Sequence, residues 1–298
     1  MKHWKPAVIA ALWSGALYAA PKPVVASFSI LGDVAQQIGG ERVAVQSLVG
    51  ANQDAHAYNL TSSDIKKIRE ARLVLLNGLG LEKAELQRAV KQSKVASAEA
   101  TAGIKPLAAD EHHHEHNHGH DHDHGEFDPH VWNDPVLMQR YAANVAIALI
   151  KADPAGSRYY QQRFKDYQNV LNQLNNYANQ QFGAVAPAKR KVLTGHDSFA
   201  YLGKRYQVKF ISPQGVSSEA EPSARQIAAI IRQIKAENVK AVFTENIKDG
   251  RMIARIAKET GVKVSGGLYA DALSSGAPAG TYADMFRYNV RVMSEAMK

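Results

Sequence analysis

Short apolar runs alternate with segments of helical period along most of the chain from residue 24 onward. Runs rich in Val, Leu and Ala predict strands, and each is followed by a stretch whose apolar residues recur every three or four positions, as on one face of a helix. In the first half, we expect strands over residues 24–29, 41–50, 72–78 and 94–100 and helices over residues 30–40, 61–71 and 81–93. This βαβα order is typical of a parallel sheet covered by helices.

The same rhythm restarts in the second half of the chain. We expect strands ending at residue 196 and covering 208–213, 239–245 and 263–270, with helices over 197–207, 223–238, 250–261 and from 281 onward. The pattern therefore predicts an α/β protein of two lobes, each a short, mostly parallel sheet flanked by helices. The lobes are expected over residues 21–152 and 184–298.

One long helix, predicted over residues 153–183, lies between the two lobes. Its apolar side chains recur at steps of four and three and form a single stripe: Tyr160, Phe164, Tyr167, Leu171, Leu174 and Ala178. At 1.5 Å per residue the helix would span roughly 40 Å. A coiled-coil seam is the alternative, but about three heptads is short for one, so we expect a rigid helix that packs along both lobes and joins them.

A further helix is expected to begin at Asp134-Pro135, with the aspartate as N-cap and proline at the first helical position.

The N-terminus predicts export. Residues 1–5 are basic, residues 7–17 are apolar, and Ala19 and Ala20 supply small residues for cleavage, so residues 1–20 are interpreted as a signal peptide. A buried N-terminal helix is the alternative. The chain contains no cysteine, which excludes disulfides, thiolate metal ligands and a lipidated cysteine. We therefore expect a periplasmic monomer that is not lipid-anchored.

The net charge of +8 is scattered along the chain. A nucleic-acid-binding protein usually gathers lysine and arginine with aromatic residues on one face. No such stripe is found in the sequence, so we expect no nucleic-acid partner.

Histidine is concentrated in one segment, and nine of the twelve fall between Glu111 and Pro135. The segment over residues 110–127 has almost no apolar side chain, so it is predicted to be a mobile loop that binds zinc weakly at several exchanging sites. Residues 114–118 match the zinc-protease pattern H-E-x-x-H, but that pattern requires a helix packed on a core, and a chance match is expected in so dense a run. The weak sites would use His112, His113, His114, His116, His118, His120, His122 and His124.

Three other histidines, His56, His130 and His196, lie far apart in sequence. Each comes just after a predicted strand or at a junction between a loop and a helix, and Asp271 has the same placement. Ligands of open α/β sheets bind beyond the carboxyl ends of strands, and three imidazoles with one carboxylate can form a closed tetrahedral zinc site. Glu245, at the end of another strand, could accept a hydrogen bond from one of these imidazoles. The alternative is that all five are ordinary surface or core residues.

Two segments carry a resemblance to a known family. DPHVWNDP (128–135) and GHDSFAYLGKRYQ (195–207) resemble the segments around metal-binding histidines in the metal-specific solute-binding proteins of ABC importers, the periplasmic zinc and manganese carriers. Weaker matches are QDAHAYNLTSSD (53–64), VFTENIKD (242–249) and LYADALSS (268–275). In the first of these, Ala55 and Asn59 stand where the family usually has a proline and an acidic residue. The resemblance covers nearly the whole mature chain and implies the ligand set His56, His130, His196 and Asp271.

The resemblance also implies the cargo and the partner. Manganese and iron carriers of this family tend to have a glutamate where this chain has His196, and a histidine-rich loop is typical of the zinc carriers. We therefore expect an exported, high-affinity Zn²⁺-binding protein, not an enzyme, that delivers zinc to an ABC-type membrane permease, with other periplasmic zinc-binding proteins as further partners. A manganese or iron carrier, a periplasmic zinc buffer and a zinc hydrolase are the alternatives.

Overall fold

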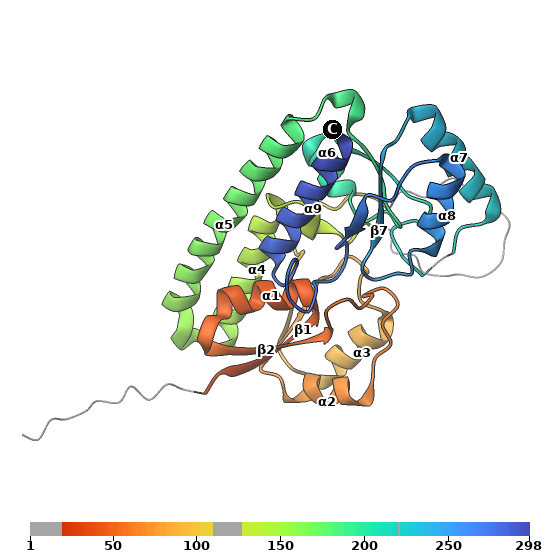
Figure 1. The fold of residues 1–298 in the computed structure, drawn as a ribbon. Coiled ribbons are helices and arrows are strands. Elements are labelled where there is room, and N and C mark those ends of the chain that lie inside the picture. The colour runs from red at the N-terminus through yellow and green to blue at the C-terminus, as the bar shows by residue number, and fades with distance from the viewer. Residues whose placement is uncertain (1–19, 110–126, 220) are drawn as a thin grey trace, which may run out of the picture.

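The computed structural model describes residues 20–109, 127–219 and 221–298, and it has two lobes (Figure 1). The first lobe contains a four-stranded sheet in the order β2-β1-β3-β4, in which every neighbouring pair is parallel. Its strands are β1 (Lys22–Phe28), β2 (Val43–Val49), β3 (Leu73–Leu76) and β4 (Ser97–Glu99). The predicted signal peptide and the predicted histidine-rich loop lie outside the described residues, apart from their last residues, Ala20 and Phe127.

The second lobe repeats this arrangement. Its sheet has the order β6-β5-β7-β8, again with parallel neighbours. Its strands are β5 (Lys191–Leu193), β6 (Lys209–Ile211), β7 (Ala241–Glu245) and β8 (Gly266–Leu268). The predicted fold class, two α/β lobes each with its own short parallel sheet, is therefore confirmed.

Helices cover both faces of each sheet. In the first lobe these are α1 (Ser29–Gly39), α2 (Ser62–Glu70), α3 (Ala84–Ser93) and α4 (Leu137–Ala152), and in the second they are α6 (Ala200–Tyr206), α7 (Ala224–Glu237), α8 (Arg251–Thr260) and α9 (Tyr282–Met297). The predicted capping boxes at Thr61 and Ser223 are both present, each with a side chain accepting the N–H three residues on. The last helix begins beside Thr281, as predicted.

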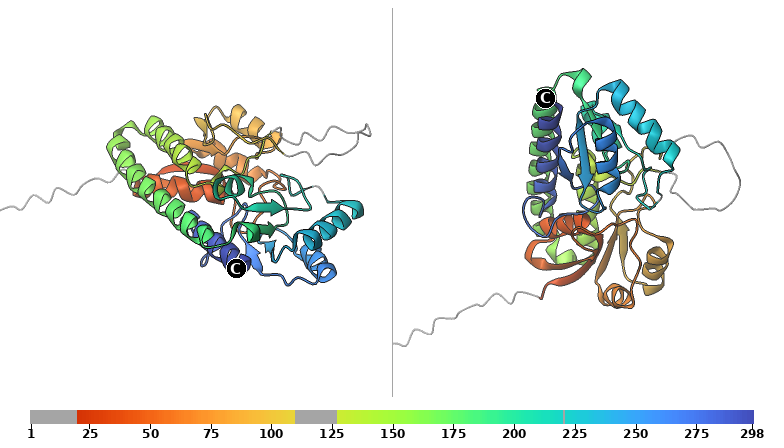
Figure 2. Two further views of the ribbon diagram at one scale, coloured as in Figure 1. Left: turned by 90° about the horizontal axis from the view of Figure 1, so that it is seen from above. Right: turned by 45° about the vertical axis from the view of Figure 1, so that its right-hand side comes forward.

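The long helix α5 (Ser157–Gly183) is the predicted connection between the lobes, preceded by a turn of 3₁₀ helix over Pro154–Gly156. Of the predicted stripe, Phe164 is half-buried and the other five side chains are buried. The helix packs on α1 and α4 of the first lobe and on α9 of the second, and Figures 1 and 2 show it running along both. It is therefore a helix shared by two lobes and not one strand of a coiled coil.

A single hydrophobic core extends through both lobes. Alternate residues of β1 point to opposite faces of the sheet: Val24 and Ala26 join the shared core, whereas Val25 faces a smaller cluster under α2 and α3. In β7, Phe243 likewise joins the shared core while Val242 faces the cluster under α7 and α8. One face of each sheet thus belongs to a core common to the whole molecule.

Two predicted helix starts were wrong. Helix α4 begins at Leu137 and not at Asp134-Pro135, although the Asp134 carboxylate still accepts the N–H of Val136 at 2.8 Å. Helix α6 begins at Ala200 and not at residue 197, because Asp197 and Ser198 instead make backbone hydrogen bonds to Gly215 and His196. In both places, residues next to a candidate ligand adopt irregular backbone that the local pattern does not reveal.

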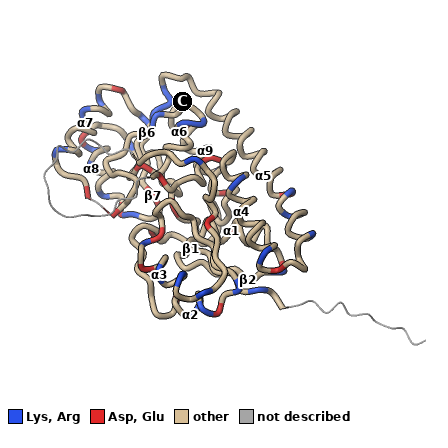
Figure 3. Tube along the Cα trace, turned by 180° about the vertical axis from the view of Figure 1, so that it is seen from behind, with Lys and Arg blue, Asp and Glu red and all other residues tan. Residues whose placement is uncertain are grey.

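Charged side chains are distributed over both lobes. Figure 3 shows lysine and arginine on α2, α5, α7 and α8, interspersed with acidic residues. Among the described residues, no helix combines the length and the hydropathy that crossing a membrane requires.

Candidate metal centre

Four segments that are distant in sequence meet between the two sheets. His56 lies between β2 and α2, and His130 lies between β4 and α4, immediately before a 3₁₀ turn over Val131–Asn133. His196 follows β5, and Asp271 follows β8. Since all strands of a parallel sheet end at the same edge, the carboxyl edges of the two sheets present these side chains to one another.

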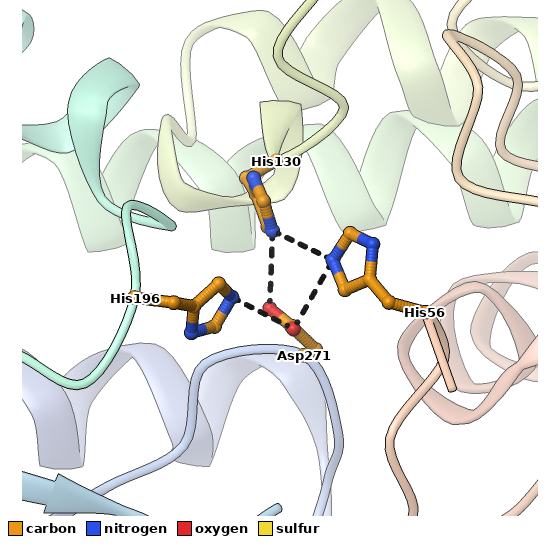
Figure 4. A group of neighbouring side chains, drawn as sticks. All are labelled: His56, His130, His196 and Asp271. Atoms are coloured by element: carbon orange, nitrogen blue, oxygen red, sulfur yellow. Dashed lines mark hydrogen bonds and ion pairs between the residues drawn. The ribbon is translucent and has the colours of Figure 1, made fainter. Parts of the chain in front are cut away.

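The four side chains point toward a common centre (Figure 4). The Nε2 atoms of His56 and His130 are 3.2 Å apart. Asp271 approaches all three imidazoles: its Oδ2 lies 3.0 Å from Nε2 of His196 and 3.5 Å from Nε2 of His56, and its Oδ1 lies 3.4 Å from Nε2 of His130. One candidate ligand atom from each residue fits within 4.8 Å of all the others. The structure thus brings together the four residues of the predicted ligand set.

Burial removes these groups from water. His130, His196 and Asp271 have no exposed surface, and His56 is 7 % exposed. Both Asp271 oxygens and Nε2 of His196 make no hydrogen bond of normal geometry within the described part of the chain. Buried polar atoms are rarely left unsatisfied in native proteins, so these atoms fit the bonding needs of a cation placed among them.

Carboxylates orient two of the imidazoles. Nδ1 of His130 lies 2.7 Å from Asp128 Oδ1, and Nδ1 of His196 lies 2.6 Å from Glu245 Oε2. A proton held on Nδ1 by a carboxylate leaves the Nε2 lone pair free and more basic, which is the usual arrangement around metal-binding histidines. The structure therefore places Glu245 where the sequence suggested, beside an imidazole nitrogen, and it adds Asp128.

Hydrogen bonds to two aspartate side chains also fix the backbone of two histidines, a feature that was not predicted from the sequence. Asp54 Oδ1 accepts the main-chain N–H of His56 at 2.9 Å, and Asp128 Oδ1 accepts that of His130 at 2.9 Å. An aspartate bonded to the backbone two residues on forms a local turn. The signal for it was the repeated Asp-x-His spacing at 54–56 and 128–130.

Electrostatics favour a charged pair in the absence of metal. Burial lowers the pKa of His196, but the negative charges of Glu245 and Asp271 outweigh it and raise that pKa well above its usual value. Burial likewise raises the pKa of Asp271, but the histidines around it, His196 foremost, outweigh it and hold the pKa well below its usual value. A cation and a proton therefore compete for the same imidazole of His196.

Hydrogen bonds between the lobes fix the position of one half of the site relative to the other. Trp132 Nε1 donates to the carbonyl of Ala270 at 2.8 Å, directly before Asp271. The Trp132 ring packs edge-on against His130, with the ring centroids 5.1 Å apart. The main-chain carbonyl of Trp132 accepts a hydrogen bond from the hydroxyl of Tyr282 at 2.8 Å. Trp132 is completely buried. The distance between His130 and Asp271 is therefore set by one rigid side chain that contacts both segments.

The arrangement suits a four-coordinate metal. Three imidazole Nε2 atoms and one carboxylate are four ligands of types that Zn²⁺ accepts, and four is the usual coordination number of zinc. The histidines predicted as weak sites, His112 to His124, lie outside the described residues.

Comparisons with known proteins identify relatives that bind metal ions. A family model described as zinc-uptake complex component A, periplasmic (ZnuA) matches residues 24–296. The manganese-binding lipoprotein MntA of Bacillus subtilis is 32% identical over 285 residues, covering 92% of this chain and 89% of its own length. The iron ABC transporter substrate-binding lipoprotein MtsA of Streptococcus pyogenes serotype M1 is 27% identical over 275 residues, covering 92% and 88%.

Solved structures share the whole fold. The periplasmic zinc-binding protein TroA from Treponema pallidum superimposes with a TM-score of 0.85 at 26% identity, covering 93% of this chain and 99% of its own. A manganese-bound periplasmic metal-binding protein from Candidatus Liberibacter asiaticus gives a TM-score of 0.78 at 28% identity, covering 93% and 100%.

Proposed function

Because the chain belongs to the family of periplasmic zinc-uptake component A proteins, we propose that it is an exported zinc carrier. Like its family and relatives, the chain is a metal-specific substrate-binding protein of an ABC importer. In our proposal it captures Zn²⁺ with high affinity through His56, His130, His196 and Asp271, and it delivers the ion to a membrane permease.

The donor set carries the proposal that the ion is zinc. Three buried imidazoles with one carboxylate match the ligands and the coordination number that zinc accepts, whereas manganese favours more oxygen ligands and a higher coordination number. At His196 this chain supplies nitrogen, and Glu245 keeps that nitrogen available by holding the proton on the other side of the ring. A manganese or iron carrier remains the alternative, since relatives named for both metals align with this chain.

A competition experiment tests the metal. Purified protein without residues 1–20 is loaded with Zn²⁺ and dialysed against equal concentrations of Zn²⁺ and Mn²⁺, and the bound metal is measured by mass spectrometry. We expect zinc to occupy the tight site in nearly every molecule, because divalent affinities at nitrogen-rich sites rise steeply from manganese to zinc. Predominant manganese would refute the zinc assignment while leaving the carrier function in place.

The remaining parts of the proposal concern location and chemistry. The absence of cysteine supports a carrier that is not lipidated, unlike the relatives named as lipoproteins. The closed ligand set supports a binding protein over a zinc hydrolase, since a catalytic zinc needs an open position. Zinc-dependent hydrolysis abolished by His196→Ala would contradict this.

A further inference from the structure

A short segment of the second lobe, Gln214–Glu219, crosses from one half of the candidate metal centre to the other. It follows β6, and its first residue forms a parallel bridge with His196. The N–H of Asp197 donates to the carbonyl of Gly215 at 3.1 Å, one residue further on. This segment, which we call the strap, is therefore anchored at its start to the backbone that carries His196.

The far end of the strap is anchored to the first lobe. The hydroxyl of Ser218 donates to Asp54 Oδ2, and Glu219 Oε1 lies 2.8 Å from Nζ of Lys83. Ser218 has no exposed surface, whereas the Glu219 side chain is 47 % exposed. The buried hydrogen bond to a charged carboxylate is the stronger of the two links, since a hydrogen bond to an ionised group is shorter and stronger than a neutral one and a half-exposed ion pair contributes little.

Asp54 connects the strap to a candidate ligand. While Oδ2 accepts the hydroxyl of Ser218, Oδ1 accepts the N–H groups of His56 and Ala57 at 2.9 and 3.3 Å. Among the described residues, no carboxylate lies against Nδ1 of His56, in contrast to the other two histidines. The placement of His56 therefore depends on its backbone, and the backbone depends on Asp54.

Open space borders the first residue of the strap. A cavity of about 190 Å³ lies beside it, lined by Gln214 together with Gly195 and Glu245 on the side of the metal centre. His56, the ligand that Asp54 holds, is also the only one of the four with measurable exposure. Of the four candidate ligands, His56 is therefore the least shielded from solvent, and it is the one that Asp54 links to the strap.

We propose that the strap is a latch over the metal centre and that the Asp54–Ser218 hydrogen bond controls how fast the metal leaves. Breaking this bond frees the strap and loosens the backbone of His56, so one coordination bond is lost more often. Asp54 and Ser218 act as positioning residues, since neither is among the four ligands. The inference rests on the proposed metal-carrier function and adds to it a control on the rate of release.

The test measures zinc dissociation from the full mature chain. Zn²⁺-loaded protein is mixed with excess chromogenic chelator in a stopped-flow instrument, and the rate is compared among wild type, Ser218→Ala and Ser217→Ala. Ser217 is the matched control, because it is the same residue type one position away and its hydroxyl accepts only the N–H of Glu219 within the strap at 3.3 Å. We expect Ser218→Ala to release zinc about tenfold faster or more, the size of a lost charge-assisted hydrogen bond, and Ser217→Ala to match wild type.

A second comparison separates a latch from a general structural defect. In the wild-type protein, Ser218→Ala should greatly increase the rate of zinc release. In a protein that already carries Asp54→Ala, the same substitution should have almost no effect, because the hydrogen-bond partner of Ser218 is already gone. The urea midpoints for unfolding of the zinc-free proteins should not show this difference between the two backgrounds. Equal effects in both backgrounds would overturn the proposal.

Two further outcomes test the latch and the proposed function separately. If Ser218→Ala does not fold, Asp54→Asn removes the charge from the same hydrogen bond instead, and it should raise the release rate about threefold or more. An unchanged rate in that variant would also overturn the latch. A wild-type protein that binds no zinc at the four-residue centre would refute the proposed function, whereas tight zinc binding with unaltered release in every variant would refute the latch alone.

Discussion

Each histidine of the centre is positioned by a carboxylate that is itself not a candidate ligand. Asp128 and Glu245 engage the far ring nitrogens of His130 and His196, and Asp54 engages the backbone of His56. Glu245 does both, since its Oε1 also accepts the main-chain N–H groups of Gly195 and His196 at 2.8 and 3.1 Å. The geometry of the cage is therefore set one layer of residues outside it.

Replacing Glu245 by glutamine should weaken metal binding by about ten- to a hundredfold, the usual range for such partners. A glutamine amide would donate to Nδ1 of His196, so the ring proton would move to Nε2 and block the metal. Calorimetric titration with Zn²⁺ measures the effect. Glu237→Gln, on an α7 surface where Glu237 pairs with Lys209, is the control and should bind as wild type. Equal affinities for the two variants would show that Glu245 does not orient the ligand.

Metal affinity should fall as the pH is lowered. In the metal-free protein burial lowers the pKa of His196, but the charges of Glu245 and Asp271 outweigh burial and raise it well above its usual value, so protons compete strongly with a metal for this imidazole. Zinc requires its neutral form, and binding must therefore release a proton. Titrations at pH 7 in two buffers of different ionisation enthalpy should give different heats. Identical heats would mean that no proton is displaced.

Sequence reasoning predicted the four residues that the structure brings together, but only part of their support. His56, His196, Asp271 and Glu245 could be predicted because each follows a strand, and parallel strands end at one edge. His130 was predicted from its place just before a helix and from the family resemblance of DPHVWNDP. The contact of Trp132 with the Ala270 carbonyl joins residues 138 positions apart, and no local pattern encodes it. The link from Ser218 to Asp54, 164 positions apart, is of the same kind.

At the level of elements, helix starts were predictable where the cap is local. Helix α2 begins after Thr61, whose side chain accepts the N–H of Asp64, while the Asp64 carboxylate accepts the N–H of Thr61 at 3.0 Å. Four residues suffice to specify this arrangement. Helix α6 could not be placed in the same way, because the N–H of Asp197 bonds to the strap and that of Ser198 bonds to His196.

The α2 cap should stabilise the protein only where Asp64 is ionised. Burial raises its pKa, but hydrogen bonds from Thr61, Tyr58 and Lys67 outweigh that effect and lower the pKa to about 2 from 3.8. Because the folded-state pKa is the lower one, the stabilisation is complete above about pH 4 and is lost as the pH falls toward 2. Asp64→Asn should cost about 1 kcal/mol at pH 7.

Urea unfolding at pH 7 and pH 3 measures this difference, which should be smaller at pH 3. Asp166→Asn, on the exposed side of α5 where the carboxylate accepts only the side chain of Gln162, is the control and should change little at either pH. A deficit for Asp64→Asn that is equal at both pH values would contradict the assigned role of its charge.

For the whole molecule, metal binding should be visible as stability. A ligand that binds only the folded state stabilises it by about 4 kcal/mol when present at a thousand times its dissociation constant. Zn²⁺ should therefore raise the unfolding temperature measured by calorimetry, and His130→Ala combined with His196→Ala should abolish the rise.

Deleting residues 112–124 serves as the control for that experiment. We expect the shortened chain to lose weak zinc sites and to keep the rise in unfolding temperature, because the tight centre lies elsewhere. Loss of the rise on deletion would favour the alternative of a zinc buffer that operates through the histidine-rich segment.

The core that runs through both lobes has a consequence for selectivity. Carriers whose lobes swing freely can close to different extents around ions of different size. Here α5, α9 and one face of each sheet pack into a single interior, and close-packed interiors switch between discrete arrangements more readily than they deform. The lobes are therefore not expected to close by degrees around each ion, and an ion is discriminated by whether its radius and preferred geometry match one of the discrete arrangements that the shared interior allows.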